Sequence, residues 1–485
     1  YGSIGYFGWC SISKQMAMYY MTGNEACARE VVRLAFPDAQ AIRDIEEIDG
    51  ERIENKHDPL AGFYHYNAHM AILFWDLIEE SPAFSDEERL EITNAFARQL
   101  NHRKGEGVYN LTRPPRSVGS RHGQWSAISL YCLGRYFDKD YPNPIWAQCV
   151  RGGRLAFGSL HEHAWIAGES DNLFWYSTGI APVFTYMTLT GDRKPLENGV
   201  VAQLLRGQEM LVSGRDQDWA LNSASIGMLN KAAYLTGDGR WSYYRDRTGV
   251  DTGIFRLGQS FWPDETAAPQ PPTDLVGKWN VNRLPEPAWA ARGSGLPLEQ
   301  SFYFGSYRSA VDASGDYILL DGFNGASRNP YHTFDILQLR LGGRTVLDGY
   351  HNQVLTSADG MVEPAVAMDA ALVYAGVVGS TATAVGEVPG MAFCNWRRML
   401  AQRTGRYTLV VDDLTFRTDS RNMSVATTWE VRGGRWDASE QRIRAAGMEL
   451  RSCDVQRAQG SGVVTLEWNG AVNRQQHRDR KSTRL

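Results

Sequence analysis

The sequence has few cysteines, no long apolar run and no excess of basic residues. Its six cysteines are spread over 485 residues without a CxxC pair, so they describe no disulfide framework. The apolar stretch 70–78 (MAILFWDLI) is interrupted by Asp76 and is shorter than the roughly 20 residues of a membrane helix. The formal net charge is −5, and charges of both signs are interspersed. We therefore expect a soluble protein with no nucleic-acid and no membrane partner, whose oligomeric state the sequence does not fix.

The first half of the chain has helical patterning. Ser85 and Glu88 form a capping box before the apolar positions of residues 85–100 (SDEERLEITNAFARQL). Three further apolar runs end in Thr-Gly followed by Asn or Asp, at Asn24, Asp192 and Asp238. Glycine at such a position takes the left-handed conformation that closes a helix. The spacing of the last two copies predicts repeated helical hairpins, which bury their faces on one another in a solenoid or a closed α/α toroid.

The second half changes in composition after a proline-rich stretch at 263–277 (PDETAAPQPPTDLVG). Segments beyond it have strand-like composition and partial alternation, typical of an antiparallel sandwich; they are SFYFGSYRSAV, DYILLDGF, FDILQLRL, RTVLDGY, YTLVVDDLTF and SVATTWEV. We predict an α/α toroid, an incomplete barrel of helical hairpins, at 1–260. A proline-rich linker at 261–300, an antiparallel β-sandwich at 301–470 and a disordered tail at 471–485 complete the prediction.

Two residues of the helical half form a candidate catalytic pair. His122 lies in the stretch SVGSRHGQW after Arg121, and Tyr176 follows it by 54 positions, about one helical hairpin. Successive hairpins of a toroid line one central cavity, so the two side chains are expected to face one another. A base, an acid and a cation or amide that neutralises a carboxylate are the groups required for β-elimination at a uronic acid. Arg121 or Gln124 is the candidate for the neutralising group.

The order of these motifs resembles the heparinase II/III-like polysaccharide lyases and the related alginate lyases. A histidine in an RHGQW turn is followed by the tyrosine and then by the β-rich half. That half contains SYRSAVDASGDYILLDGFNGASRNPYHTFDILQLRLGGRTVLDGY and WRRMLAQRTGRYTLVVDDLTF, which look like that family's strand and turn pattern. The resemblance covers most of residues 100–420. It implies a toroid followed by a sandwich, and cleavage of an acidic polysaccharide such as a glycosaminoglycan or alginate, which leaves a 4,5-unsaturated uronate.

The resemblance also implies a role for each matching position. His122 matches the catalytic histidine, which acts as the base or contacts the carboxylate, and Tyr176 matches the tyrosine that serves as acid, and in some members as both acid and base. Arg121 stands where relatives place an asparagine that neutralises the carboxylate, and His332 looks like a histidine that the β-sandwich contributes. The candidates for sugar contacts are Gln124, Arg113, Arg116, His65, Tyr66, Glu169, Trp175 and Tyr350.

No cofactor is required for this chemistry, but the resemblance adds one structural zinc ion. Its expected ligands are His332, Asp348 and Cys394, an imidazole, a carboxylate and a thiolate that together suit zinc. The family pattern His-x-His-x-Asp is reduced here to NPYHTFD, which has a single histidine. The resemblance further implies a location in the periplasm or outside the cell.

Two other functions remain open at this point. A glycoside hydrolase on a similar toroid would use paired carboxylates, such as Asp171 with Asp216 or Asp218. A non-catalytic glycan-binding protein is the other alternative, because Arg121 and the NPYHTFD stretch depart from the family pattern.

Overall fold

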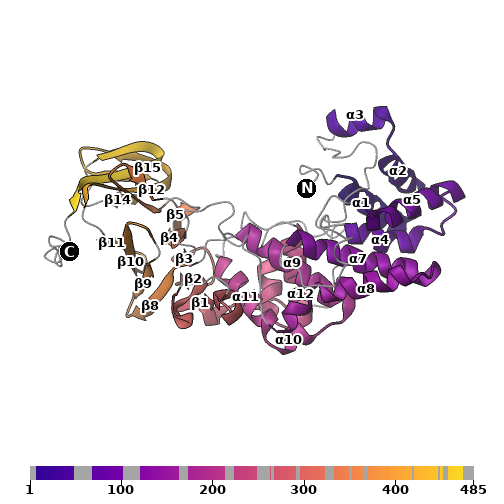
Figure 1. The fold of residues 1–485 in the computed structure, drawn as a ribbon, viewed down its shortest axis with the longest axis horizontal. Coiled ribbons are helices and arrows are strands. Elements are labelled where there is room, and N and C mark those ends of the chain that lie inside the picture. Colours follow the sequence, from indigo (N-terminus) through magenta and orange to yellow (C-terminus); the bar gives the residue numbers. More distant parts are fainter. Residues whose placement is uncertain are drawn as a thin grey trace. The chain divides into compact units, whose positions relative to one another are not determined.

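The structure is a computed structural model of the 485-residue chain (Figure 1). It describes residues 7–47, 68–101, 121–162, 173–212, 223–247, 263, 267–290, 295–322, 333–348, 352–363, 369–389, 391–417, 420–445, 448–451 and 457–472. Of Arg121, His122 and Trp175 the structure describes the backbone alone.

A helical N-terminal region is followed by antiparallel sheets, as the sequence predicts. The helices of this region are α1 (Phe7–Thr22), α2 (Glu25–Ala35), α3 (Ala39–Glu47), α4 (Ala68–Ile78), α5 (Asp86–Arg98), α7 (Arg121–Asp140), α8 (Pro144–Leu155), α9 (Leu173–Thr190), α10 (Lys194–Glu197), α11 (Val200–Leu211), α12 (Ser223–Thr236) and α13 (Gly239–Asp246). Among the described helices, none is long and apolar enough to cross a membrane. The predicted capping box is confirmed, because Ser85 accepts from the Glu88 amide and Glu88 accepts from the Ser85 amide.

The repeated Thr-Gly-Asn/Asp corners share one geometry. Gly23, Gly191 and Gly237 have φ values of 66°, 69° and 67°, and the amide of each donates to the carbonyl four residues earlier. The preceding threonine donates its hydroxyl to a carbonyl of its own helix and accepts from the amide two residues ahead. Asn24 and Asp238 then cap the next helix. The predicted helix stop is confirmed in all three copies, and each corner connects two consecutive helices.

The second half of the chain forms three antiparallel sheets. A five-stranded sheet has the order β1-β2-β3-β4-β5, and a four-stranded sheet has the order β11-β10-β9-β8. A six-stranded sheet has the order β14-β13-β12-β6-β7, with β15 paired to β12. The strands are β1 (Trp279–Arg283), β2 (Phe302–Arg308), β3 (Tyr317–Asp321), β4 (Ile336–Leu341), β5 (Arg344–Asp348), β6 (Val354–Ala358), β7 (Met361–Val362), β8 (Ala371–Val378), β9 (Thr381–Val388), β10 (Cys394–Arg403), β11 (Tyr407–Phe416), β12 (Ser420–Asp437), β13 (Arg442–Ala445), β14 (Met448–Arg451) and β15 (Arg457–Val472).

The segment 261–300 is not a structureless linker. It contains β1, which pairs with β2, and the short helix α15 (Glu286–Ala290). No clear strand pattern is present in this segment, because asparagine and arginine alternate with the apolar residues of WNVNR. At the other end, β15 continues to Val472, and the rest of the expected tail lies outside the described residues.

The chain divides into two compact units that alternate along the sequence. Unit 1 comprises residues 1–167, 177–202 and 219–270, and unit 2 comprises residues 168–176, 203–218 and 271–485. Helix α9 therefore belongs to unit 2 at its first residues and to unit 1 afterwards, while α11 passes from unit 1 to unit 2.

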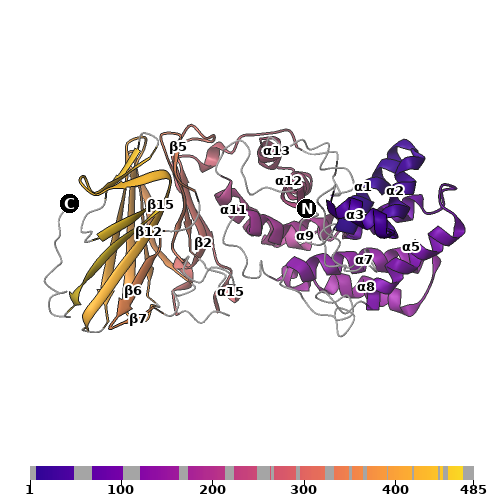
Figure 2. The ribbon, with the colours of Figure 1, turned by 90° about the horizontal axis from the view of Figure 1, so that it is seen from above.

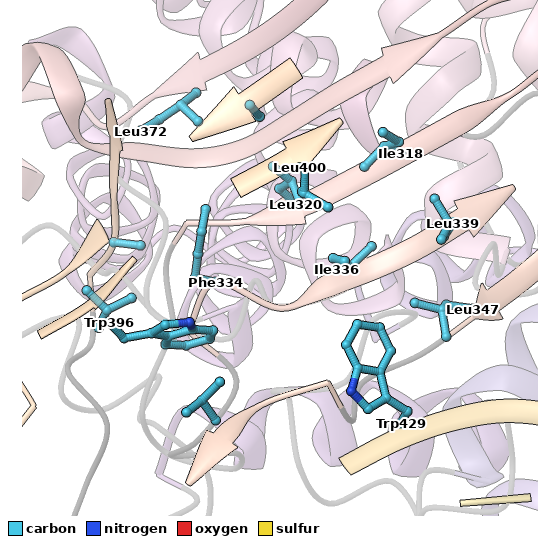
Figure 3. Packing of buried hydrophobic residues seen from close by; sticks show 14 of the residues in the cluster. Ile318, Leu320, Phe334, Ile336, Leu339, Leu347, Leu372, Trp396, Leu400 and Trp429 are labelled. Atoms are coloured by element: carbon cyan, nitrogen blue, oxygen red, sulfur yellow. The ribbon is translucent and has the colours of Figure 1, made fainter. Parts of the chain in front are cut away.

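The core of unit 2 draws on all three sheets. Phe334, Trp396, Leu400 and Trp429 lie in it together with buried aliphatic residues of β3 and β4 (Figure 3). The ring of Phe334 packs so closely on Gly386 that a Cβ atom there would lie 2.1 Å from the ring. Burying such large side chains contributes roughly 1.5–3 kcal/mol each, which makes this core the main source of the unit's stability.

A buried arginine connects the strands of this core. Arg398 on β10 is fully buried and makes five hydrogen bonds: two to the Asp412 carboxylate, two to Asn352 and one to the Phe334 carbonyl. Its guanidinium also lies 4.7 Å from the ring centroid of Trp396. Asn352 in turn exchanges two hydrogen bonds with the backbone of Ile336. Arg398 thereby holds together β10, β11 and the backbone on either side of β4 and β5.

We expect Arg398→Met to destabilise unit 2 strongly. The substitution removes the guanidinium donor from the Asp412 carboxylate and from three other acceptors, and the loss of one partner of a buried ion pair typically costs about 3–5 kcal/mol. In calorimetry the transition of unit 2 should fall on the order of 10 °C. The matched control is Arg397→Met on the same strand, since Arg397 is half exposed and lies 3.6 Å from Glu387. Equal shifts for the two variants would contradict the role given to Arg398.

Candidate functional site

The first turn of α7 carries the predicted catalytic histidine. The helix begins at Arg121, so the backbone of Arg121 and His122 forms its N-terminal turn. Gln124 and Trp125 in the same turn are buried, and the Trp125 ring stacks on His69 of α4 at a centroid distance of 5.4 Å. This packing of α4 against α7 fixes the position of the helix end that contains the backbone of His122.

Tyr176 lies on α9 and is enclosed by residues of unit 2. Its side chain is 1% exposed, and its hydroxyl donates to the Leu204 carbonyl at 2.8 Å. Its ring packs edge-on against Tyr303 and Phe304 of β2. The sequence predicts that Tyr176 faces a cavity of the toroid. Its side chain instead packs within unit 2, in which α9 begins. His122 belongs to unit 1, and the expectation that the two side chains face one another stays a prediction.

Gly207 on α11 makes room for the tyrosine hydroxyl. A Cβ atom at this position would lie 2.1 Å from the Tyr176 oxygen and 2.6 Å from Nδ2 of Asn282. Asn282 on β1 is itself buried. Burial raises the pKa of Tyr176 well above its usual value, and the interaction with Tyr303 adds to this, while the Asn282 hydrogen bond opposes it. The hydroxyl therefore keeps its proton at neutral pH, as an acid must and a base cannot.

The C-terminal end of α11 is capped from the sheet beside it (Figure 2). Arg308 of β2 is buried and donates to the Glu209 carbonyl, and the Tyr317 hydroxyl of β3 donates to the Met210 carbonyl. Both carbonyls lie in the last turn, where the helix offers no amide donors. The positive charge of Arg308 also matches the negative end of the helix dipole. Arg308 was not among the residues predicted from the sequence. Its charge within the apolar run SFYFGSYR could have indicated a buried arginine with specific partners.

The structure describes two of the three expected zinc ligands, Asp348 and Cys394, and the zinc site stays a prediction. Asp348 on β5 accepts from Gln338 of β4 at 3.0 Å. Cys394 on β10 is buried in the apolar core, and burial together with the Glu363 carboxylate raises the pKa of its thiol to about 12. Zinc needs the thiolate, which this environment disfavours. Within the described residues, no three histidine, cysteine, aspartate or glutamate side chains form a metal-binding group.

Several candidate positions lie outside the described residues; they are His65, Tyr66, Arg113, Arg116, Glu169, His332 and Tyr350, and for the hydrolase alternative Asp171, Asp216 and Asp218. The structure does describe residues that closely follow two of these positions, His332 and Tyr350, in the sequence, and Arg398 holds them by hydrogen bonds. Arg398 binds the carbonyl of Phe334, two residues after His332, and both the side chain and the carbonyl of Asn352, two residues after Tyr350.

Solved structures of polysaccharide lyases share this fold. Heparinase III aligns with 94% of this chain and 73% of its own length, with a TM-score of 0.57 and 10% identity. The heparan sulfate lyase of Pedobacter heparinus aligns with 94% of this chain and 72% of its own, with a TM-score of 0.50 and 14% identity. No protein-family model and no curated protein matches the sequence. The chain thus has the heparinase III fold, a helical toroid followed by an antiparallel β-sandwich.

We expect Gly207→Ala to destabilise unit 2. Alanine favours a helix by about 1 kcal/mol over glycine, but the added methyl group collides with Tyr176 and Asn282, and such overpacking costs roughly 1–3 kcal/mol. Urea unfolding should show a net loss, while Arg206→Ala at an exposed position of α11 should be neutral. In the double variant with Tyr176→Phe, which removes the closest atom, the total loss should be smaller than the sum of the two single losses. A Gly207→Ala protein as stable as the parent would rule out this close contact.

We expect the zinc content of the purified protein to be independent of Cys394. Elemental analysis should give the same value for the parent and for Cys394→Ser, because a buried neutral thiol is a poor ligand. A full equivalent of zinc that disappears in both Cys394→Ser and Asp348→Asn would restore the ligand set expected from the sequence.

Proposed function

We propose that this protein is a polysaccharide lyase that cleaves a uronic-acid-containing acidic polysaccharide by β-elimination. The observation that carries the proposal is the shared fold: 94% of the chain aligns with heparinase III. A fold alone does not define an activity. The proposal therefore also depends on the residues that match the lyase motifs, His122 at the start of α7 and Tyr176 on α9.

In the proposed reaction His122 removes the proton at C5 of the uronic acid. The electron pair of that bond forms the C4=C5 double bond as the bond between C4 and the glycosidic oxygen breaks. Tyr176 donates its proton to the leaving oxygen, and the raised pKa of its hydroxyl keeps the proton in place before this step. Arg121 or Gln124 neutralises the C6 carboxylate, which acidifies the C5 proton and stabilises the enolate-like intermediate. His332 contacts the sugar from the β-sandwich.

The enclosure of Tyr176 sets a condition on this mechanism. Its hydroxyl proton is engaged by the Leu204 carbonyl, and its ring lies against Tyr303 and Phe304. Proton transfer to a sugar requires that this hydrogen bond be exchanged for one to the glycosidic oxygen. Local separation of α9 from β2 is therefore a required step before catalysis.

The partner in this proposal is an acidic polysaccharide or an oligosaccharide derived from it. Heparan sulfate, alginate, hyaluronate, ulvan and glucuronan all carry the required uronic acid. Such polymers are found outside the cytoplasm, so we propose a periplasmic or secreted location. The proposed reaction requires no metal, and the structural zinc ion expected at His332, Asp348 and Cys394 is not needed for any of its steps.

The buried hydroxyl of Tyr176 favours one alternative, a glycan-binding protein without catalytic activity. If Tyr176 only supports the packing of α9 and α11 on β2, the proposed site lacks its acid. Such a protein would bind a uronate polymer and leave it intact.

We expect His122→Ala and Tyr176→Phe each to lower kcat by about 10²-fold or more, as the loss of an acid or base typically does. The matched control is Tyr317→Phe, since Tyr317 also donates a buried hydroxyl to a backbone carbonyl of α11. Both phenylalanine variants should lose similar stability, about 1–3 kcal/mol, because each leaves one carbonyl without its partner. Near-parental kcat in Tyr176→Phe would remove it from the mechanism.

The activity is measured on a panel of uronate polymers by the ultraviolet absorbance of the conjugated double bond. New reducing ends with matching absorbance support the lyase. New reducing ends without absorbance indicate a hydrolase instead, and binding without either product indicates the glycan-binding alternative.

A further inference from the structure

The outer face of the four-stranded sheet in unit 2 has an unusual composition. Strands β8, β9, β10 and β11 are neighbours in this sheet (Figure 1), and one of its faces packs on the core through residues such as Leu400 and Ala384. The other face is accessible to solvent, and an antiparallel sheet normally carries polar residues there. Here Tyr374, Val385, Met399 and Val411 lie opposite one another on the four strands, and all four are partly or largely exposed.

Tyr374 lies along its own strand on this face. The end of its ring covers Gly376, because a Cβ atom there would lie 2.4 Å from the Tyr374 oxygen and 2.8 Å from the carbon that carries it. The side chain is nevertheless 48% exposed. A ring laid along the sheet turns one face to solvent, and such a face stacks on the apolar face of a sugar ring.

Positive charge gathers at one end of the same face. The next rows contain Leu409 opposite Ala401, and Tyr407 opposite Arg403, and Arg406 lies in the adjoining turn. Arg403 and Arg406 are exposed, and neither has a hydrogen-bonding or ion-pair partner for its side chain within the described part of the chain. Arginine binds carboxylates and sulfates with two parallel hydrogen bonds, so this end of the face suits an anion.

The size of the face favours a glycan over a protein partner. With strands about 4.8 Å apart and side-chain rows about 6.8 Å apart, the three rows from Met399 to Arg403 span roughly 14 Å in each direction. The next row of this face, with Glu387, Arg397 and Asp413, is of mixed charge and lies at the end away from Arg403. The three rows cover on the order of 200 Å², well below the ~800 Å² per partner of a stable protein interface. An extended acidic sugar chain needs only such a narrow contact, with an aromatic ring for stacking and arginines for its charges.

We propose that this outer face, formed by the exposed side chains of β8 to β11 and the turn at Arg406, is a second binding site for an anionic polysaccharide. No residue of this site takes part in the proposed reaction. The inference rests on the proposed function only for the class of ligand, an acidic polysaccharide. A chain bound there raises the local concentration of polymer near the enzyme. Binding weakens with salt, because arginine contacts to exposed anionic groups are screened.

The test is affinity electrophoresis of the full chain through gels that contain heparan sulfate, alginate or neutral dextran. The parent should be retarded by at least one acidic polymer and not by dextran. Arg403→Ala with Arg406→Ala, and Tyr374→Ala separately, should each weaken the apparent affinity about tenfold or more, while Tyr374→Phe keeps it. The matched control is Arg344→Ala, an exposed arginine of the same unit outside this face. Thermal unfolding confirms that each variant is folded.

Three outcomes would overturn this second site: unchanged retardation of the Arg403/Arg406 variant, an equal loss in Arg344→Ala, or no retardation of the parent. A variant that loses self-association in sedimentation but keeps its polymer affinity would identify a protein interface instead. The result is separable from the proposed lyase activity. Turnover of a short uronate oligosaccharide should be the same in the parent and the arginine variant, and a parent that binds polymer without turnover contradicts the lyase but not this surface.

Discussion

The organisation of the β-rich unit depends on one buried guanidinium. Arg398 provides five hydrogen bonds to groups that are far apart in the sequence, and its side chain is fully buried. A buried charge is tolerated only when its partners are complete. The ion pair with Asp412 and the carbonyls of Phe334 and Asn352 meet this requirement, so the strand pair β10–β11 and the connections around β4 and β5 form together or not at all.

The sequence predicted those parts of the fold that are local. A Thr-Gly-Asn/Asp corner requires only its own backbone, and all three copies have the predicted geometry. Strand β11 coincides with the predicted segment YTLVVDDLTF, because its turns and alternation are contained within it. Strand β1 was missed, since WNVNR becomes a strand only by pairing with β2. No short-range pattern contains that pairing.

The candidate site was less predictable for the same reason. The stretch RHGQW does begin a helix, but the surroundings of Tyr176 come from α11, β1 and β2, which are separated from it by up to about 130 residues. Gly207 and Asn282 carry no recognisable motif and matter only through their distance from one hydroxyl. Arg398 and Asp412 were noticed as parts of a family-like pattern, whereas their mutual hydrogen bonds follow only from the register of β10 and β11. Spacing along the chain identified candidates, and packing decides what each candidate contacts.

The path of α9 and α11 through both units affects how the chain folds during synthesis and whether its halves can be exchanged in evolution. The first turn of α9 and most of α11 cover β2, although the chain reaches β2 only after the rest of the helical region. A fragment that starts at the proline-rich stretch would expose Phe304, Arg308 and Tyr317 to water. The β-rich half therefore cannot be exchanged as an independent module at that point, and during synthesis on the ribosome it completes its core only against helices that were made earlier.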